Sequence, residues 1–136
     1  PGKAQVFWQS KRPEVAIVGC GGLLHNALLA ARDLEKEGIG TMVVNCHTIK
    51  PLDKEAIVAA AKTTGAVVTV EEHQITGGLG GRIAETLAHH APTPMEFIGM
   101  QGVYGESGSP AQLLEKYGMG VRHIKEAVKK VLKRKR

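Results

Sequence analysis

The residues with the clearest potential for chemistry lie in the stretch EEHQITGGLGGR, residues 71–82. Glu71, Glu72 and His73 place two carboxylates beside an imidazole, and a carboxylate can orient a histidine and raise its pKa for general-base catalysis. The stretch starts in a strand-like run, and successive side chains of a strand point to opposite faces of a sheet. We therefore expect Glu71 and Glu72 on opposite faces, and the sequence offers no nucleophile that must pair with them.

Four glycines follow in the same stretch, just before a helix-like segment. Glycines let the backbone turn sharply and expose N–H groups, and the N-terminus of a helix favours an anion. Arg82 is expected in the first helical turn, where the dipole disfavours a cation, so an acidic partner or an anionic ligand is expected beside it. Two interpretations stay open: a tight turn for close packing at an interface, which the residues favour, or an anion or regulatory loop formed by Glu72, His73, Gly77, Gly78, Gly80, Gly81 and Arg82.

Two other motifs lack the spacing that their chemistry requires. GCGG, residues 19–22, follows a strand-like run as a dinucleotide-binding loop would. However, Leu24 stands where the third glycine belongs, and the next strand ends in Asn45 and Cys46 rather than in an acid. Ser107 in GESG lacks the Gly-x-Ser-x-Gly pattern of a nucleophile elbow, so a helix cap or a loop hydrogen bond explains it better.

The chain contains two cysteines, Cys20 and Cys46, each at the end of a strand-like run. Two thiols without a wider framework indicate a reducing compartment, and we expect a cytoplasmic protein. His25 and His47 lie nearby in the sequence, but their spacing matches no recognised zinc site. Free thiols and no metal site are the expectation.

Length and composition indicate one globular domain over residues 1–136, since the chain is 43% hydrophobic and near the common domain size. Residues 1–13 are read as a linker with an edge strand, and they lack both an initiator methionine and a signal-peptide core, as a piece of a longer protein would. No apolar run approaches ~18 residues, so no membrane partner is expected. The net charge of +5 is concentrated in a basic tail, residues 129–136, expected to be solvated, and no nucleic-acid motif accompanies it.

Strand-like and helix-like runs alternate along the chain, a pattern typical of a mostly parallel sheet covered on both faces. Strands are expected at residues 4–9, 15–20, 41–46, 66–72 and 95–100. Helices are expected after each of the last four strands, with Asp53 capping the second helix and a short helix before Gly118. The loops after the strand ends would then lie along one edge of the sheet, where such folds usually bind ligands.

Three motifs, in this order and spacing, resemble the C-terminal domain of transketolases: HTIKPLD (47–53), TVEEHQITGGLGGRIAE (69–85) and VYGESGSPAQLLEKYGM (103–119). With the strand–helix unit at residues 15–39, the resemblance covers nearly the whole chain. GESGSP followed by LLEKYG favours transketolase over two groups of relatives with similar domains. These alternatives are deoxyxylulose-phosphate synthase and the beta subunits of 2-oxoacid dehydrogenases, and a stand-alone phosphate- or nucleotide-binding module is a further alternative.

The resemblance implies a three-layer α/β/α fold with a five-stranded mixed sheet, mostly parallel, in the order 1-3-2-4-5 with the first strand antiparallel. It implies a complete transferase of the pentose phosphate pathway that moves a two-carbon ketol unit between sugar phosphates with thiamine diphosphate and a divalent metal. In the family, the cofactor lies between the two preceding domains of a dimer. This chain would then hold no cofactor, metal or catalytic residue, and Glu72 and His73 are not expected to be catalytic. Its implied role is assembly with the thiamine-binding domains or an N-terminal subunit, with a regulatory anion as a further expectation.

Overall fold

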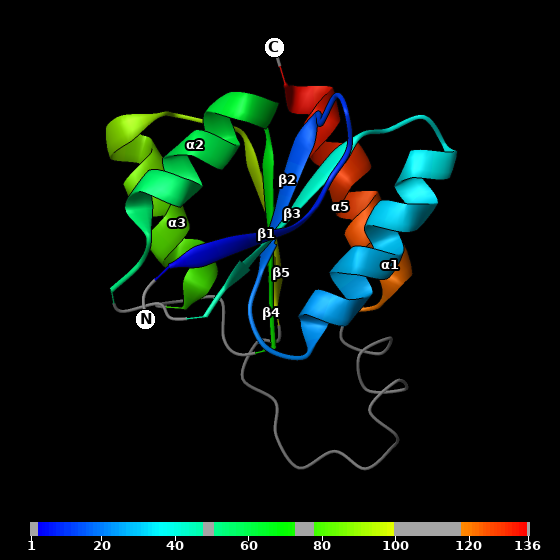
Figure 1. Ribbon diagram of the computed structural model, residues 1–136, viewed down its shortest axis with the longest axis horizontal. Coiled ribbons are helices and arrows are strands. Elements are labelled where there is room, and N and C mark those ends of the chain that lie inside the picture. The colour runs from blue at the N-terminus through cyan, green and yellow to red at the C-terminus, as the bar shows by residue number, and fades with distance from the viewer. Residues whose placement is uncertain (1–2, 48–50, 73–77, 100–117, 136) are drawn as a thin grey trace.

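The computed structural model describes residues 3–47, 51–72, 78–99 and 118–135, which form three layers (Figure 1). The strands are β1 (Ala4–Gln9), β2 (Val15–Gly19), β3 (Thr41–Cys46), β4 (Val67–Glu71) and β5 (Met95–Gly99). The helices are α1 (Leu23–Lys36), α2 (Lys54–Thr64), α3 (Leu79–His90) and α5 (Val121–Arg134). In Figure 1 the sheet is seen nearly edge-on, with α2 and α3 on its left and α1 and α5 on its right.

The sheet confirms the expected fold class and strand order. The order is β1-β3-β2-β4-β5, with β1 antiparallel to β3 and the other pairs parallel. The edge strand expected at residues 4–9 has these bounds in the structure, and β2 and β4 are each slightly shorter than expected. Strand β5 begins at the expected residue, and Met100, the last residue expected in it, lies outside the described residues. The short helix expected before Gly118 lies outside the described residues.

The core has two halves, one on each face of the sheet, because side chains alternate along the fully buried strands β2, β3 and β4. One half packs against α1 and α5 and includes Val15, Ile17, Val43, Val68 and Val70. The other half packs against α2 and α3 and includes Ala16, Val18, Met42, Val44 and Val67. Burial on both faces explains why these strands are continuously apolar in the sequence.

Capping residues fix the ends of α2 as the sequence predicts. The side chain of Asp53 accepts a hydrogen bond from the N–H of Ala56 at 3.2 Å, which satisfies a free amide of the first turn. Gly65 ends the helix with φ of 83°, a left-handed conformation that favours glycine. Asp53 also accepts a hydrogen bond from the N–H of Ala4 at 2.9 Å, so it joins the start of β1 to the start of α2.

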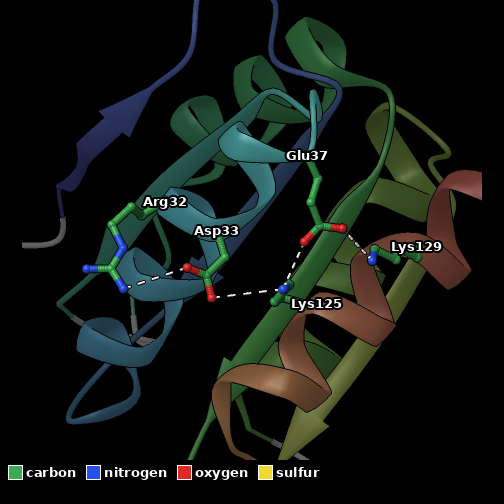
Figure 2. Close-up of polar contacts among 5 residues, drawn as sticks. All are labelled: Arg32, Asp33, Glu37, Lys125 and Lys129. Atoms are coloured by element: carbon green, nitrogen blue, oxygen red, sulfur yellow. Dashed lines mark hydrogen bonds and ion pairs between the residues drawn. The ribbon is translucent and has the colours of Figure 1, made fainter.

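The C-terminal helix is held to α1 by a chain of exposed ion pairs, drawn in Figure 2. Glu37 lies 2.8 Å from the Nζ of Lys125 and 2.7 Å from the Nζ of Lys129. Lys125 also contacts Asp33 at 3.9 Å, and Asp33 in turn contacts Arg32 at 3.6 Å. Exposed pairs of this kind contribute little individually, so they orient α5 while its apolar face supplies the stability.

The cations of the basic segment are largely exposed, with side-chain exposures of 47% at Lys129, 71% at Lys130 and 48% at Arg134, and they also form ion pairs. The α5 helix includes the residues of this segment as far as Arg134, and Lys129 pairs with Glu37 as described above. Glu96 of β5 contacts both Lys130, at 3.6 Å, and Arg134, at 2.6 Å. These ion pairs are not readable from the sequence, because the acidic residues that face the cations belong to elements distant in the sequence.

Candidate functional site at the carboxyl edge of the sheet

The carboxyl edge of the sheet has the topology that usually creates a ligand site. The chain leaves β2 toward α1 on one face, whereas β3 and β4 lead to α2 and α3 on the other face. Such a reversal beside a central strand opens a crevice at the strand ends, where α/β proteins bind ligands. The described residues at this edge that could do chemistry are Cys20, Asn45, Cys46, His47, Glu71 and Glu72.

Glu71, the last residue of β4, caps the N-terminus of α3. Its side chain is buried, and its two oxygens accept hydrogen bonds from the N–H of Leu79 at 2.9 Å and the N–H of Gly80 at 2.7 Å. The N-cap residue, Gly78, has no side chain that could do this. The first amides of a helix and its dipole favour a negative charge, so the protein supplies its own anion at the site where the sequence suggested an external one.

Glu72 points to the opposite side of the sheet, as the strand geometry predicts. A Cβ atom placed on Gly22 would lie 2.3 Å from Oε1 of Glu72, so this carboxylate lies against the backbone of Gly22. Gly22 is the N-cap residue of α1, which has no capping side chain of its own. Two successive glutamates therefore reach the beginnings of two helices on opposite faces, as the alternation of side chains along a strand predicts.

The glycines of the loop permit close packing. Gly80 and Gly81 lie inside the first turn of α3, so the helix starts earlier than the sequence suggested. A Cβ atom on Gly80 would lie 2.8 Å from Cδ1 of Phe97 and 2.9 Å from Oγ1 of Thr69. A side chain at this position would push α3 away from β4 and β5, which means that Gly80 is needed for contact within the domain.

The remaining predicted loop residues divide into two groups. His73 and Gly77 lie outside the described residues. Arg82 is half-buried in the first turn of α3, where it was expected. Within the described ranges, its side chain makes no hydrogen bond or ion pair, so the expected acidic partner is not among these residues.

The two thiols at this edge are close neighbours with low nucleophilicity. Gly19 of β2 is paired in register with Asn45 of β3, so Cys20 and Cys46 follow at adjacent strand ends, and both are free. Burial raises the pKa of Cys46 to about 12. Burial also raises the pKa of Cys20, and the charges of Glu71 and Glu72 raise it further. Both groups are therefore protonated thiols at neutral pH, whereas nucleophilic attack requires a thiolate.

The family described as "Transketolase, C-terminal domain" matches residues 2–124. The chain belongs to the transketolase C-terminal domain family. This confirms the resemblance that the three sequence motifs indicated.

The curated relatives of this transketolase C-terminal domain are much longer proteins. The chain is 42% identical over 122 residues to the 6-deoxy-6-sulfo-D-fructose transketolase subunit SqwH of Clostridium sp. (strain MSTE9), covering 90% of this chain and 38% of that protein. It is 39% identical over 129 residues to the transketolase of Rattus norvegicus, covering 94% of this chain and 20% of that enzyme. The chain thus spans two-fifths or less of these relatives.

Solved structures agree with the family. A chain described as "Split gene transketolase, inactive beta4 tetramer" matches with 45% identity and a TM-score of 0.92, covering 100% of this chain and 44% of that chain. The transketolase of Campylobacter jejuni subsp. jejuni NCTC 11168 matches with a TM-score of 0.68. Its 21% identity makes it a comparison of fold alone.

The described part of this transketolase C-terminal domain was compared with the requirements of a metal site through its histidine, cysteine and acidic side chains. Among its described residues, no three of the histidine, cysteine, aspartate and glutamate side chains gather closely enough to hold a metal ion. His47 instead contacts the side chains of Gln5, at 3.0 Å, and Asn45, at 3.2 Å. No helix in the described ranges has the length and apolar character needed to cross a membrane.

The capping role of Glu71 is the feature that sequence reasoning missed. The sequence did contain a signal for this cap. The residue before α3 is a glycine, which has no side chain to accept a hydrogen bond, and an acidic residue lies at the end of the preceding strand. The missing information was the approach of α3 to β4, which is a tertiary contact rather than a local pattern.

Proposed function

We propose that this chain is the non-catalytic C-terminal domain of a transketolase that uses thiamine diphosphate and a divalent metal. The family match over residues 2–124 carries this proposal, and the 45% identity to a split-gene transketolase chain supports it. The relatives are far longer than this domain, so the cofactor, the metal and the catalytic residues would be held by other domains, tethered or separate. The reaction is transfer of a two-carbon ketol unit between sugars.

The arrangement at the carboxyl edge supports a structural role for this domain. A catalytic carboxylate must be free to exchange a proton or contact a substrate. Glu71 instead has both oxygens bonded to backbone amides, and the thiols of Cys20 and Cys46 are protonated. Glu71 thus serves the packing of α3 rather than proton transfer, and we expect catalysis to depend on residues of the other domains.

The proposed partners are the thiamine-binding domains, or an N-terminal subunit, of the same enzyme, in a complete enzyme that is a cytoplasmic dimer. The substrates of that enzyme would be ketose and aldose phosphates. One relative is named for 6-deoxy-6-sulfo-D-fructose, a ketose with a sulfonate in place of a phosphate. Both kinds of substrate present a ketol end, which is the part that is transferred, and the anionic end would be recognised by the other domains.

Calorimetry and reconstitution together test this proposal. Titration of the chain with thiamine diphosphate and magnesium should give no binding heat. Mixed with the thiamine-binding polypeptide of the same organism, it should support ketol transfer from a ketose phosphate to an aldose phosphate, measured by a coupled assay. Tight cofactor binding by this chain alone, or ketol transfer without the second polypeptide, would refute the proposal.

Arg82 supports a second candidate function, binding of a regulatory phosphate. It is a half-buried cation without a partner among the described residues, near the N-terminus of α3. Glu71 already occupies the amides of Leu79 and Gly80, so a bound anion would depend on the guanidinium. A ligand that binds only the native state raises the melting temperature.

We therefore expect millimolar sugar phosphates to raise the melting temperature of the wild type and to leave Arg82→Ala unchanged. Lys62→Ala, which removes an exposed cation of α2, is the matched control and should retain the shift. If no phosphorylated compound changes the melting temperature of the wild-type chain, this second function is wrong.

A further inference from the structure

The two cysteines of the chain occupy neighbouring positions at the ends of adjacent strands. Gly19 of β2 and Asn45 of β3 are in register in a parallel pair. Cys20 and Cys46 are the next residues along these two segments. Neighbouring strands lie about 4.8 Å apart, and a disulfide bond requires a Cα···Cα distance of about 4.4–6.8 Å. The register therefore places the two backbones at a separation that a disulfide bond can span.

The two thiols also lie on the same face of the sheet. Side chains two positions apart along a strand point the same way, and Val18 and Val44 both belong to the half of the core that packs against α2 and α3. Cys46 is a member of that half, and Cys20 packs against it. Burial raises the pKa of Cys46 to about 12, and the neighbouring Cys20 contributes to the same shift. Position and direction therefore both bring the two side chains together.

The two thiols differ in their access to solvent. Cys20 is half-buried, whereas Cys46 is 2% exposed. A small oxidant can therefore reach Cys20 directly, and an oxidised Cys20 presents its sulfur to Cys46. Redox-sensitive sites combine an accessible cysteine with a resolving cysteine in this way. Burial raises the pKa of Cys20 and the charges of Glu71 and Glu72 raise it further, so the first oxidation step should be slow.

We propose that Cys20 and Cys46 form an intramolecular disulfide bond when the chain is exposed to hydrogen peroxide. The Cys20 sulfur attacks one oxygen of the peroxide, the O–O bond breaks, and a sulfenic acid and one water form. The Cys46 sulfur then attacks the Cys20 sulfur, the S–O bond breaks, and the disulfide and a second water form. The two thiols together lose two protons and two electrons, which reduce the peroxide to water.

The disulfide bond would connect two segments at the carboxyl edge of the sheet. Cys20 precedes the start of α1, and Cys46 is the last residue of β3, from which the chain continues to α2. The bond would hold the ends of β2 and β3 together and would keep the Cys20 sulfenic acid from further, irreversible oxidation. This redox site goes beyond the proposed function and does not depend on it, because it uses residues of this chain alone.

Peptide mapping by mass spectrometry after peroxide treatment of the folded chain tests the proposal. The chain has no other cysteines, so an intramolecular disulfide has one possible pairing. We expect the peptides that contain Cys20 and Cys46 to be joined, and dithiothreitol to restore both thiols. At millimolar peroxide the reaction should take on the order of hours. A chain that keeps both thiols free, or forms the bond only in urea or only between two chains, would overturn the proposal.

Two variants separate the roles of the thiols. Cys46→Ala removes the resolving thiol, so peroxide should convert Cys20 to a sulfinic acid that dithiothreitol does not reduce. Cys20→Ser removes the accessible thiol, so Cys46 should stay reduced in the folded chain. Equal amounts of sulfinic acid at Cys20 in the wild type and in Cys46→Ala would refute the role of Cys46 as the resolving thiol.

Thermal unfolding of the oxidised wild-type chain shows whether the bond fits the native structure. A disulfide bond stabilises a protein by constraining its unfolded chain, so the oxidised form should melt about 5–10 °C above the reduced form. Dithiothreitol should return the melting temperature to that of the reduced form. A lower melting temperature after the bond forms would show that it strains the fold, and that result would also overturn the proposal.

Discussion

Replacing Glu71 tests the idea that the protein supplies its own anion to the N-terminus of α3. The carboxylate is 2% exposed and accepts hydrogen bonds from Leu79 and Gly80 at 2.9 and 2.7 Å. In Glu71→Gln the side chain keeps its shape, but one oxygen becomes an NH₂ group that faces an N–H donor. In Glu71→Ala both amides lose their acceptor in a buried position.

The magnitude follows from the two charge-assisted hydrogen bonds. A hydrogen bond to a charged group contributes about 1.5–3 kcal/mol, and a helix cap contributes about 1 kcal/mol by a partly overlapping mechanism. We expect a loss of about 2 kcal/mol in the free energy of unfolding for Glu71→Gln and about 3–4 kcal/mol for Glu71→Ala. For a chain of this length, these losses correspond to a fall in melting temperature of about 6–15 °C.

The neighbouring residue provides the matched control. Glu72 has the same side chain, is half-buried, and makes no hydrogen bond to another described residue. Glu72→Gln should therefore change the free energy of unfolding by less than about 0.5 kcal/mol. Urea unfolding followed by circular dichroism measures all three variants, and an unchanged m-value would show that the difference lies in stability. Similar small losses for Glu71→Gln and Glu72→Gln would refute the capping argument.

Three further predictions concern packing, charge and thiol reactivity. Gly80→Ala should destabilise the domain by about 1–3 kcal/mol, because the added Cβ atom meets Phe97. Gly81 is exposed in the same turn, so Gly81→Ala should stabilise the domain by up to about 1 kcal/mol through the higher helix propensity of alanine. Urea unfolding should show these opposite signs. Hydrogen bonds to two lysines lower the pKa of Glu37 from 4.5 to about 2, so its stabilising effect is present above pH 4.5 and is lost as the pH falls toward 2. The melting temperatures of wild type and Glu37→Gln should therefore converge in acid, and also in molar salt at neutral pH; a constant difference would contradict this. The two thiols can be compared by alkylation at pH 8 followed by mass spectrometry. Cys20 should react slowly, and Cys46 should react only after the domain unfolds. Rapid modification of Cys46 in the native domain would be inconsistent with its buried position and its pKa of about 12.

The helices and strands were predictable because their determinants are local, whereas the strand order was implied by the family resemblance. Buried parallel strands are continuously apolar, the α2 helix has a capping aspartate and a terminal glycine, and AQVFWQ marks the edge strand. The site was less predictable because it depends on contacts between distant segments. Glu71 caps a helix that begins eight positions later, and the cations of α5 meet acids on α1 and β5. Alternation along β4 did predict correctly that Glu71 and Glu72 separate to opposite faces.

Those two glutamates also bear on the choice between assembly and phosphate binding. In α/β folds that bind phosphates, the positive end of a helix points at an open crevice and remains available to the ligand. Here the carboxylate of Glu71 occupies the amides of α3, and the carboxylate of Glu72 lies against Gly22 at the start of α1. An incoming phosphate would meet two negative charges at the same edge, with Arg82 as the nearby cation that favours it. The charge arrangement therefore makes the regulatory anion the weaker of the two proposals, and the thermal-shift comparison of wild type with Arg82→Ala decides it.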